Sequence, residues 1–144
     1  MHWMKPLAAL ALALATGAGW AQSAAEPLVL RSVMQQMQTD TDAAAQALAR
    51  KDWDAVRQHA DRLAHHAEPP ALEKVRILTW LLTDAMTFRN YDLQVKSAAA
   101  QLRTAAQQQD GVAAARDLAR MQQSCDGCHN SYRTKFLAHF YGTP

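Results

Sequence analysis

The chain has 144 residues and a formal net charge of +2, a length that fits one domain. A balance this close to neutral argues against a nucleic-acid partner, which usually requires a basic stripe. Alanine and glutamine are abundant, and no segment shows the sustained period-two alternation of a half-buried strand. We therefore expect an all-α fold.

The first 21 residues have the pattern of a secretory signal peptide. A positive start containing Lys5 precedes an apolar run over residues 7–15, and the segment ends in a small-x-small sequence at Ala21. The apolar run is shorter than the ~20 residues that span a bilayer. We expect cleavage after Ala21, which leaves residues 22–144 as a single exported domain. The alternative is an N-terminal segment that is retained.

Four amphipathic helices are predicted from apolar residues that recur in steps of three and four. Asp52 is a suitable N-cap for the second helix, and Glu68-Pro69-Pro70 ends it. Asp110-Gly111 breaks the pattern after the third helix and can cap the fourth. Four such helices with short connections most simply pack as an antiparallel four-helix bundle. The predicted helices cover residues 27–50, 52–67, 71–109 with a bend allowed at Arg89-Asn90, and 112 to beyond Tyr132.

Each predicted helix has an apolar seam that we expect to face the core. The seam of the first helix is Leu30, Met34, Met37, Thr41, Ala44 and Leu48. The third helix has one stripe at Val75, Leu78, Leu82 and Ala85 and another at Tyr91, Val95, Ala98, Leu102 and Ala105. The fourth presents Leu118, Met121, Cys125, Cys128 and Tyr132.

The only two cysteines of the chain lie in the sequence Cys125-Asp126-Gly127-Cys128-His129. Cysteines three positions apart share one face of a helix, so their thiols can add to the two vinyl groups on one side of a haem. His129 is then held close to the iron and can bind it through an imidazole nitrogen. C-x-x-C-H is the signature of this covalent attachment, and we predict one covalent haem c with iron.

Two other chemistries are open to the same residues. A disulfide or redox dithiol of the thioredoxin type needs a βαβ context, and no strand is predicted. A zinc site would need His129 and His139 to complete four ligands, but the ten-residue separation of these histidines is not that of a usual zinc finger.

The haem motif, followed by Tyr132-Arg133 and placed near the C-terminus, resembles that of the cytochrome c prime family, the class II c-type cytochromes. The resemblance covers the whole exported part of the chain in helix layout, although its specific residues are few. It implies a four-helix bundle with the haem attached near the C-terminus of the fourth helix. Relatives often pair through their first two helices, so a homodimer and a monomer are both left open.

In this family a residue of the first helix faces the distal side of the iron. Low-spin members place a ligating methionine there, and high-spin members place an apolar residue that leaves the iron five-coordinate. The resemblance puts Met34 at this position, with Met37 as the fallback; the alternative for Met34 is core packing. It also implies that Arg31 lies near a haem propionate and Arg133 beside the haem, where the alternative for Arg133 is an exposed helix-end position.

Our first functional hypothesis is single-electron transfer in the periplasm by His/Met-ligated iron, with redox proteins as partners. A five-coordinate binder of nitric oxide or carbon monoxide is the second, and a zinc-stabilised helical protein is the third. The sequence offers no paired acid and base that would indicate an enzyme. We expect no stable membrane insertion, because four charged residues interrupt the most apolar later stretch, residues 72–86.

Overall fold

The computed structural model describes residues 27–142, so the predicted signal peptide at 1–21 lies outside the described residues. Within this range the chain is helical and has no strand, which confirms the all-α prediction. No helix in the described part is both long enough and apolar enough to cross a membrane. The elements in chain order are α1 (Val29–Ala49), α2 (Trp53–Ala64), α3 (Ala71–Leu81), the 3-10 turn η1 (Leu82–Asp84), α4 (Ala85–Gln107), α5 (Gly111–Cys128), the π-helical turn η2 (His129–Arg133) and α6 (Thr134–Tyr141).

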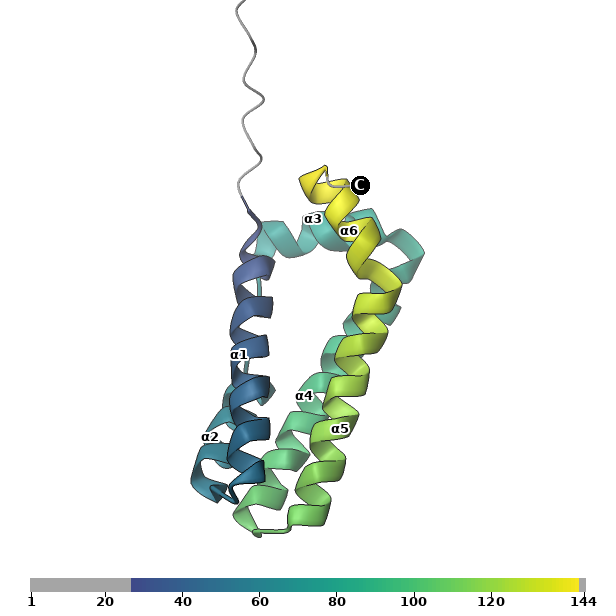
Figure 1. Ribbon diagram of the computed structural model, residues 1–144. Coiled ribbons are helices and arrows are strands. Elements are labelled where there is room, and N and C mark those ends of the chain that lie inside the picture. Colours follow the sequence, from purple (N-terminus) through teal and green to yellow (C-terminus); the bar gives the residue numbers. More distant parts are fainter. Residues whose placement is uncertain (1–26, 143–144) are drawn as a thin grey trace, which may run out of the picture.

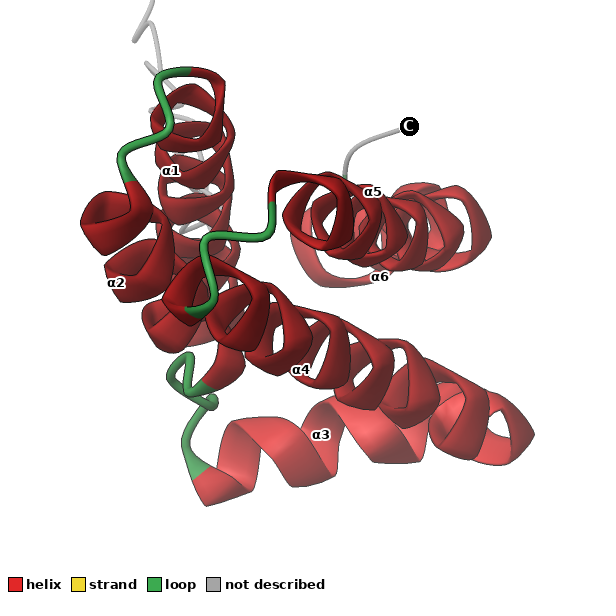
Figure 2. Cartoon of the chain, turned by 90° about the horizontal axis from the view of Figure 1, so that it is seen from below, coloured by secondary structure: helices red, strands yellow, loops and turns green. Residues whose placement is uncertain are grey.

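The helices α1, α2, α4 and α5 form an antiparallel four-helix bundle, as predicted (Figure 1). The extensively packed neighbours are α1 with α2, α2 with α4, and α4 with α5, whereas α1 and α5 meet at few points. Helix α3 crosses one end of the bundle, and η2 and α6 continue α5 toward that end (Figures 1 and 2). The seam between α1 and α5 is therefore the least closed side of the bundle.

Two aspartates cap the helices at the opposite end of the bundle. The Asp52 carboxylate accepts a hydrogen bond from the backbone N–H of Ala55 at 3.1 Å, and Asp110 accepts one from Ala113 at 2.9 Å. Both satisfy donors that an α-helix leaves without partners in its first turn. The prediction for the second helix overshoots, because α2 ends at Ala64 rather than near residue 67.

The residues predicted to form the third helix form two helices, α3 and α4, and the predicted position of a bend is wrong. The chain turns at Leu82, whose φ of 51° lies in the left-handed region, whereas a bend was allowed only at Arg89-Asn90. The stripe predicted across this break is also wrong at two positions, since Val75 is 61% exposed and Leu82 74% exposed. Helix α3 instead buries Ile77 and Leu81, because its partners lie at the end of the bundle rather than along its axis.

The buried face of α1 is rotated slightly from the predicted seam. Met37, Thr41 and Ala44 are buried as expected, but Leu30, Met34 and Leu48 are only half-buried. The positions that replace them in the core are Val33, Asp40 and Ala47. Met34 therefore lies at the edge of the packed face rather than at its centre.

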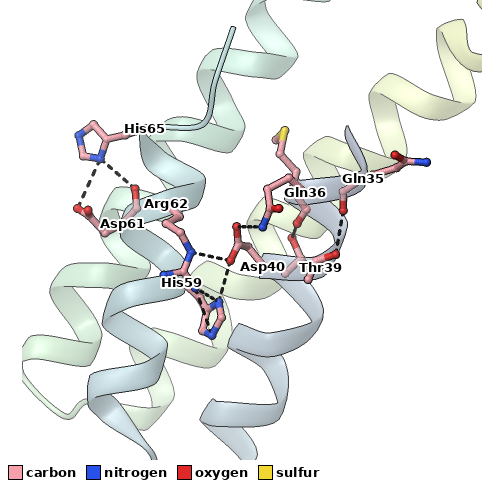
Figure 3. Close-up of polar contacts among 10 residues, drawn as sticks. Gln35, Gln36, Thr39, Asp40, His59, Asp61, Arg62 and His65 are labelled. Carbon is pink, nitrogen blue, oxygen red and sulfur yellow. Dashed lines mark hydrogen bonds and ion pairs between the residues drawn. The ribbon is translucent and has the colours of Figure 1, made fainter. Parts of the chain in front are cut away.

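A polar cluster joins α1 to α2 at Asp40, whose side chain is only 5% exposed (Figure 3). One carboxylate oxygen lies 2.8 Å from both His59 Nδ1 and Arg62 Nε, and the other accepts from Gln36 at 3.0 Å. Burial by itself would raise the pKa of Asp40, but these hydrogen bonds outweigh it and leave the pKa below its usual value. The cluster fixes the pairing of α1 with α2 one turn from Met37.

The apolar core consists of two separate clusters. The larger, the bundle cluster, contains buried residues of α1, α2, α4 and α5, including Met37, Leu102 and Met121. The smaller, the end cluster, lies where α3 and α6 meet. Its buried members are Leu28, Ile77, Leu81, Tyr132 and Phe140.

Candidate functional site

Cys125 and Cys128 lie on the last turn of α5, three positions apart and both half-buried. Neither is in a disulfide. Cys125 packs against the bundle cluster, whereas Cys128 packs against the end cluster. The two thiols therefore stand at the boundary between the two apolar clusters. A flat apolar group attached to both thiols would contact both clusters.

Burial raises the pKa of both thiols. For Cys125 the negative charge of Asp126 adds to the effect, and for Cys128 burial together with the charges of Cys125 and Asp92 raises the pKa to about 11. Reactive redox thiols require the opposite shift, because the thiolate is the nucleophile in disulfide exchange. The raised pKa of these thiols therefore does not favour the disulfide-exchange hypothesis.

His129 differs from the other histidines of the described chain. His59 and His66 contact aspartates, His65 contacts the Asp61 carbonyl, and His139 stacks on Trp80 with ring centroids 5.2 Å apart. The imidazole of His129 is exposed and, within residues 27–142, has no hydrogen-bond or ion-pair partner. It is free to bind an iron held beside Cys125 and Cys128.

The chain leaves α-helical geometry at His129. Residues from His129 to Arg133 form a π-helical turn, a form that frequently occurs at functional sites. The Ser131 hydroxyl donates to the carbonyl of Gly127 at 2.8 Å across this turn. Within the turn, Tyr132 is buried in the end cluster and Arg133 is exposed. The spacing of the motif did not reveal this turn.

The two candidate distal residues lie on α1 with different burial. Met37 is 9% exposed and is part of the bundle cluster, while Met34 is half-buried at its edge. Because α1 and α5 meet at few points, a side chain at the edge of α1 has more freedom to reach a ligand than one packed in the core. This placement is compatible with Met34 as first candidate and Met37 as fallback.

Arg31 and Arg133 are both exposed, and neither pairs with a carboxylate within residues 27–142. Each is therefore free to interact with the propionates of a haem. Their partners are not fixed by the protein fold, so the two roles implied by resemblance stay predictions.

The described residues contain no group of three or more His, Cys, Asp or Glu placed to hold a metal ion, and His139 is engaged with Trp80 rather than with the cysteines.

Aromatic residues that the sequence analysis did not assign to the site border the motif. Phe88 and Tyr91 of α4 both meet the ring of Tyr132 edge-to-face, at 5.5 Å and 6.4 Å. Tyr91 also lies directly against Gly127. The spacing of Tyr91 on its stripe was visible in the sequence, but its contact with the motif depends on the register of α4 against α5.

The residues present fit a covalent haem. Two free thiols stand one helical turn apart, each against a different apolar cluster, and they are followed by an imidazole that has no partner in the described part of the chain. Cys125, Cys128 and His129 are the residues that would hold it. Arg31 and Arg133, which form no ion pair among the described residues, are available for its carboxylates.

Comparison with known proteins agrees with this chemistry. A family model described as Cytochrome C' matches residues 29–133. The matched region begins at α1 and ends with the π-helical turn after the haem motif. Searches against curated proteins and solved structures gave no match.

Proposed function

The chain belongs to the cytochrome c prime family, and on that premise we propose that it carries single electrons between redox proteins in the bacterial periplasm and is not an enzyme. Family membership implies covalently bound haem c, which supplies reversible one-electron exchange at its iron. The observation that carries the proposal is that His129, whose imidazole has no hydrogen-bond or ion-pair partner within residues 27–142, directly follows two half-buried thiols at the boundary of two apolar clusters.

The protein residues have separate tasks in this proposal. Cys125 and Cys128 hold one haem by thioether bonds, so the group stays in place in either oxidation state. His129 supplies the proximal nitrogen. The bundle cluster and the end cluster supply apolar surroundings beside the two thiols, and burial of a bound haem there would help to set its reduction potential.

Met34 is proposed as the sixth ligand. Its position at the edge of the bundle cluster, the same cluster that Cys125 contacts, supports this assignment. A methionine ligand raises the haem potential, and iron that keeps both ligands needs little structural rearrangement on electron transfer.

A five-coordinate gas binder is the second candidate. It is favoured by one observation, that Met34 and Met37 both already pack against the bundle cluster. If this packing holds both sulfurs away from the iron, the distal face is open to nitric oxide or carbon monoxide.

Absorption spectra of the protein, exported from a host that matures c-type cytochromes, separate the two functions. We expect sharp low-spin bands in the oxidised and reduced states that carbon monoxide does not change. Met34→Ala should give a high-spin spectrum that responds to the gas, while Met37→Ala should remain low-spin. A wild-type protein that is high-spin and binds carbon monoxide would establish the second candidate instead.

Export itself is part of the proposal. The pattern of residues 1–21 supports a signal peptide, and thioether formation requires haem and reduced cysteines to meet after export. N-terminal sequencing of the mature protein from a periplasmic fraction tests this, with Gln22 as the expected first residue. A mature chain that begins at Met1 would contradict it.

A further inference from the structure

Gly127, between the two cysteines of the motif, has no room for a side chain. A Cβ atom added to it would lie 2.7 Å from Cε1 of Tyr91, 3.3 Å from Cζ and 3.4 Å from the hydroxyl oxygen. The shortest of these distances is below any that real Cβ atoms adopt. Glycine is disfavoured in the interior of a helix, so its presence in α5 has a steric explanation at this position.

The packing around Tyr91 limits how far its ring can move aside. It belongs to α4, the helix that packs most extensively along α5, and it is half-buried. Its ring meets Tyr132 edge-to-face at 6.4 Å and 74°, and Tyr132 is itself held by Phe88 at 5.5 Å. The near atoms belong to a rigid aromatic ring that packs against the end cluster on one side, so they move only if the whole ring rotates away from that contact.

Displacement at Gly127 would move every protein group that holds the haem. Cys128 directly follows Gly127, Cys125 lies two positions before Gly127, and His129 lies two positions after Gly127. All four residues lie in one continuous helical segment that runs from α5 into η2. The distance of this segment from α4 therefore also sets its distance from α1, where the distal residue lies.

We propose that Tyr91 is a positioning residue for the haem: its ring, seated against Gly127, fixes how closely the attachment motif approaches α4 and thereby sets the position of His129. The inference rests on the proposed haem function of Cys125, Cys128 and His129. Tyr91 acts through Gly127 and need not touch the iron.

The first test compares two glycine-to-alanine changes on the same helix in the exported holoprotein. At Gly111 an added Cβ meets Trp53 at 3.6 Å, an ordinary contact, so Gly111→Ala is the matched control. Gly127→Ala should lower the denaturant midpoint, the fraction of chains with covalent haem and the reduction potential relative to wild type. Gly111→Ala should leave the haem fraction and the potential unchanged. If both variants behave alike, the proposal is wrong.

The second test asks whether the ring of Tyr91 is the cause. Tyr91→Leu in the Gly127→Ala background removes the clashing ring and should restore the haem fraction and move the potential back toward wild type. Tyr91→Phe keeps the ring carbons and should not rescue. Equal rescue by Tyr91→Leu and Tyr91→Phe would overturn the proposal. Recovery of the denaturant midpoint without recovery of the reduction potential would also overturn it, because Tyr91 would then contribute only to packing.

If Gly127→Ala fails to accumulate, the single changes at Tyr91 decide. Tyr91→Leu should shift the potential and Tyr91→Phe should not, and identical potentials in the two variants would contradict the proposal. The failure of the proposed function has a different signature. In that case the wild-type protein itself carries no covalent haem, whereas the denaturant midpoints of the glycine variants still report the steric contact.

Discussion

Met34 on α1 and Cys125 on α5 pack against the same bundle cluster from helices that otherwise meet at few points. The proposed distal ligand and one covalent anchor therefore border a common apolar region. Cys128, one turn further along α5, contacts the end cluster instead. A haem attached to both cysteines would join the two clusters into one core.

Asp40→Asn should reduce the free energy of unfolding by about 1–3 kcal/mol, the cost of weakening buried hydrogen bonds to a charged group. The aspartate is 4% exposed and contacts Gln36, His59 and Arg62. Denaturant unfolding at pH 7 measures the change. Asp42→Asn, at an exposed position of the same helix, is the control and should stay within about 0.5 kcal/mol of wild type. Equal effects of both changes would mean that the Asp40 cluster does not stabilise the bundle.

The stabilisation that Asp40 provides should be lost at acid pH. The pKa of Asp40 is lower in the folded chain than its usual value of 3.8. Its contribution is therefore complete above the unfolded pKa and is lost as the pH falls through the folded pKa. The difference in stability between wild type and Asp40→Asn should shrink below about pH 4. A difference that persists unchanged at pH 2 would contradict this assignment.

His66 should make stability fall as the pH rises. Its Nδ1 faces the carbonyl of Leu63 and its Nε2 the carboxylate of Asp92, each at 2.8 Å. Both partners are acceptors, so both nitrogens must carry protons. Burial alone would lower the pKa, but the hydrogen bonds to Asp92 and Leu63 outweigh it and raise the pKa above 6.5.

Because the folded chain holds this proton more tightly, the contribution of His66 is complete below about pH 6.5 and is lost as the pH passes the folded pKa. Denaturant unfolding between pH 5.5 and 9 measures the slope, which for one proton is at most about 1.4 kcal/mol per pH unit. His66→Ala should flatten it. His65→Ala removes the exposed neighbouring imidazole and is the matched control; an unchanged slope in His66→Ala would refute the assignment.

Leu82→Gly should stabilise the protein by about 1 kcal/mol, because a leucine with positive φ is strained and glycine is not. Leu82 has φ 51° and is 74% exposed, so little packing is lost. Leu72→Gly, at an 85% exposed position inside α3, should instead destabilise by about 0.5–1 kcal/mol. Thermal unfolding of both variants checks the opposite signs, and a loss of stability in both would show that Leu82 is not strained.

Most of the helices were predictable because they depend on local patterns. Asp52 and Asp110 act as the caps that their positions indicated, and the spacing of Leu118 and Met121 identified the buried face of α5. The burial of Met37 and Ala44 followed from the same periodicity. These features need only residues within one or two turns of each other.

The remaining features depend on contacts between distant segments. The first turn of α1 has no cap of its own; instead Glu73 of α3 accepts from the backbone N–H groups of Val29 and Leu30, each at 2.8 Å. The break at Leu82 lies in an apolar run that reads as continuous helix. The contact of Tyr91 with Gly127 depends on the register of two helices. None of these three features produces a periodic pattern in the sequence.

The most direct test of the account is whether haem remains on the denatured chain. The exported protein would be extracted with acidified organic solvent, which removes haem that is bound only by ligation, and the absorbance of the remaining chain would be measured. We predict that the wild-type chain keeps one haem, that Cys125→Ser and Cys128→Ser each weaken its retention, and that the double variant loses it. A wild-type protein that is colourless after export, from cells that mature other c-type cytochromes, would contradict the account.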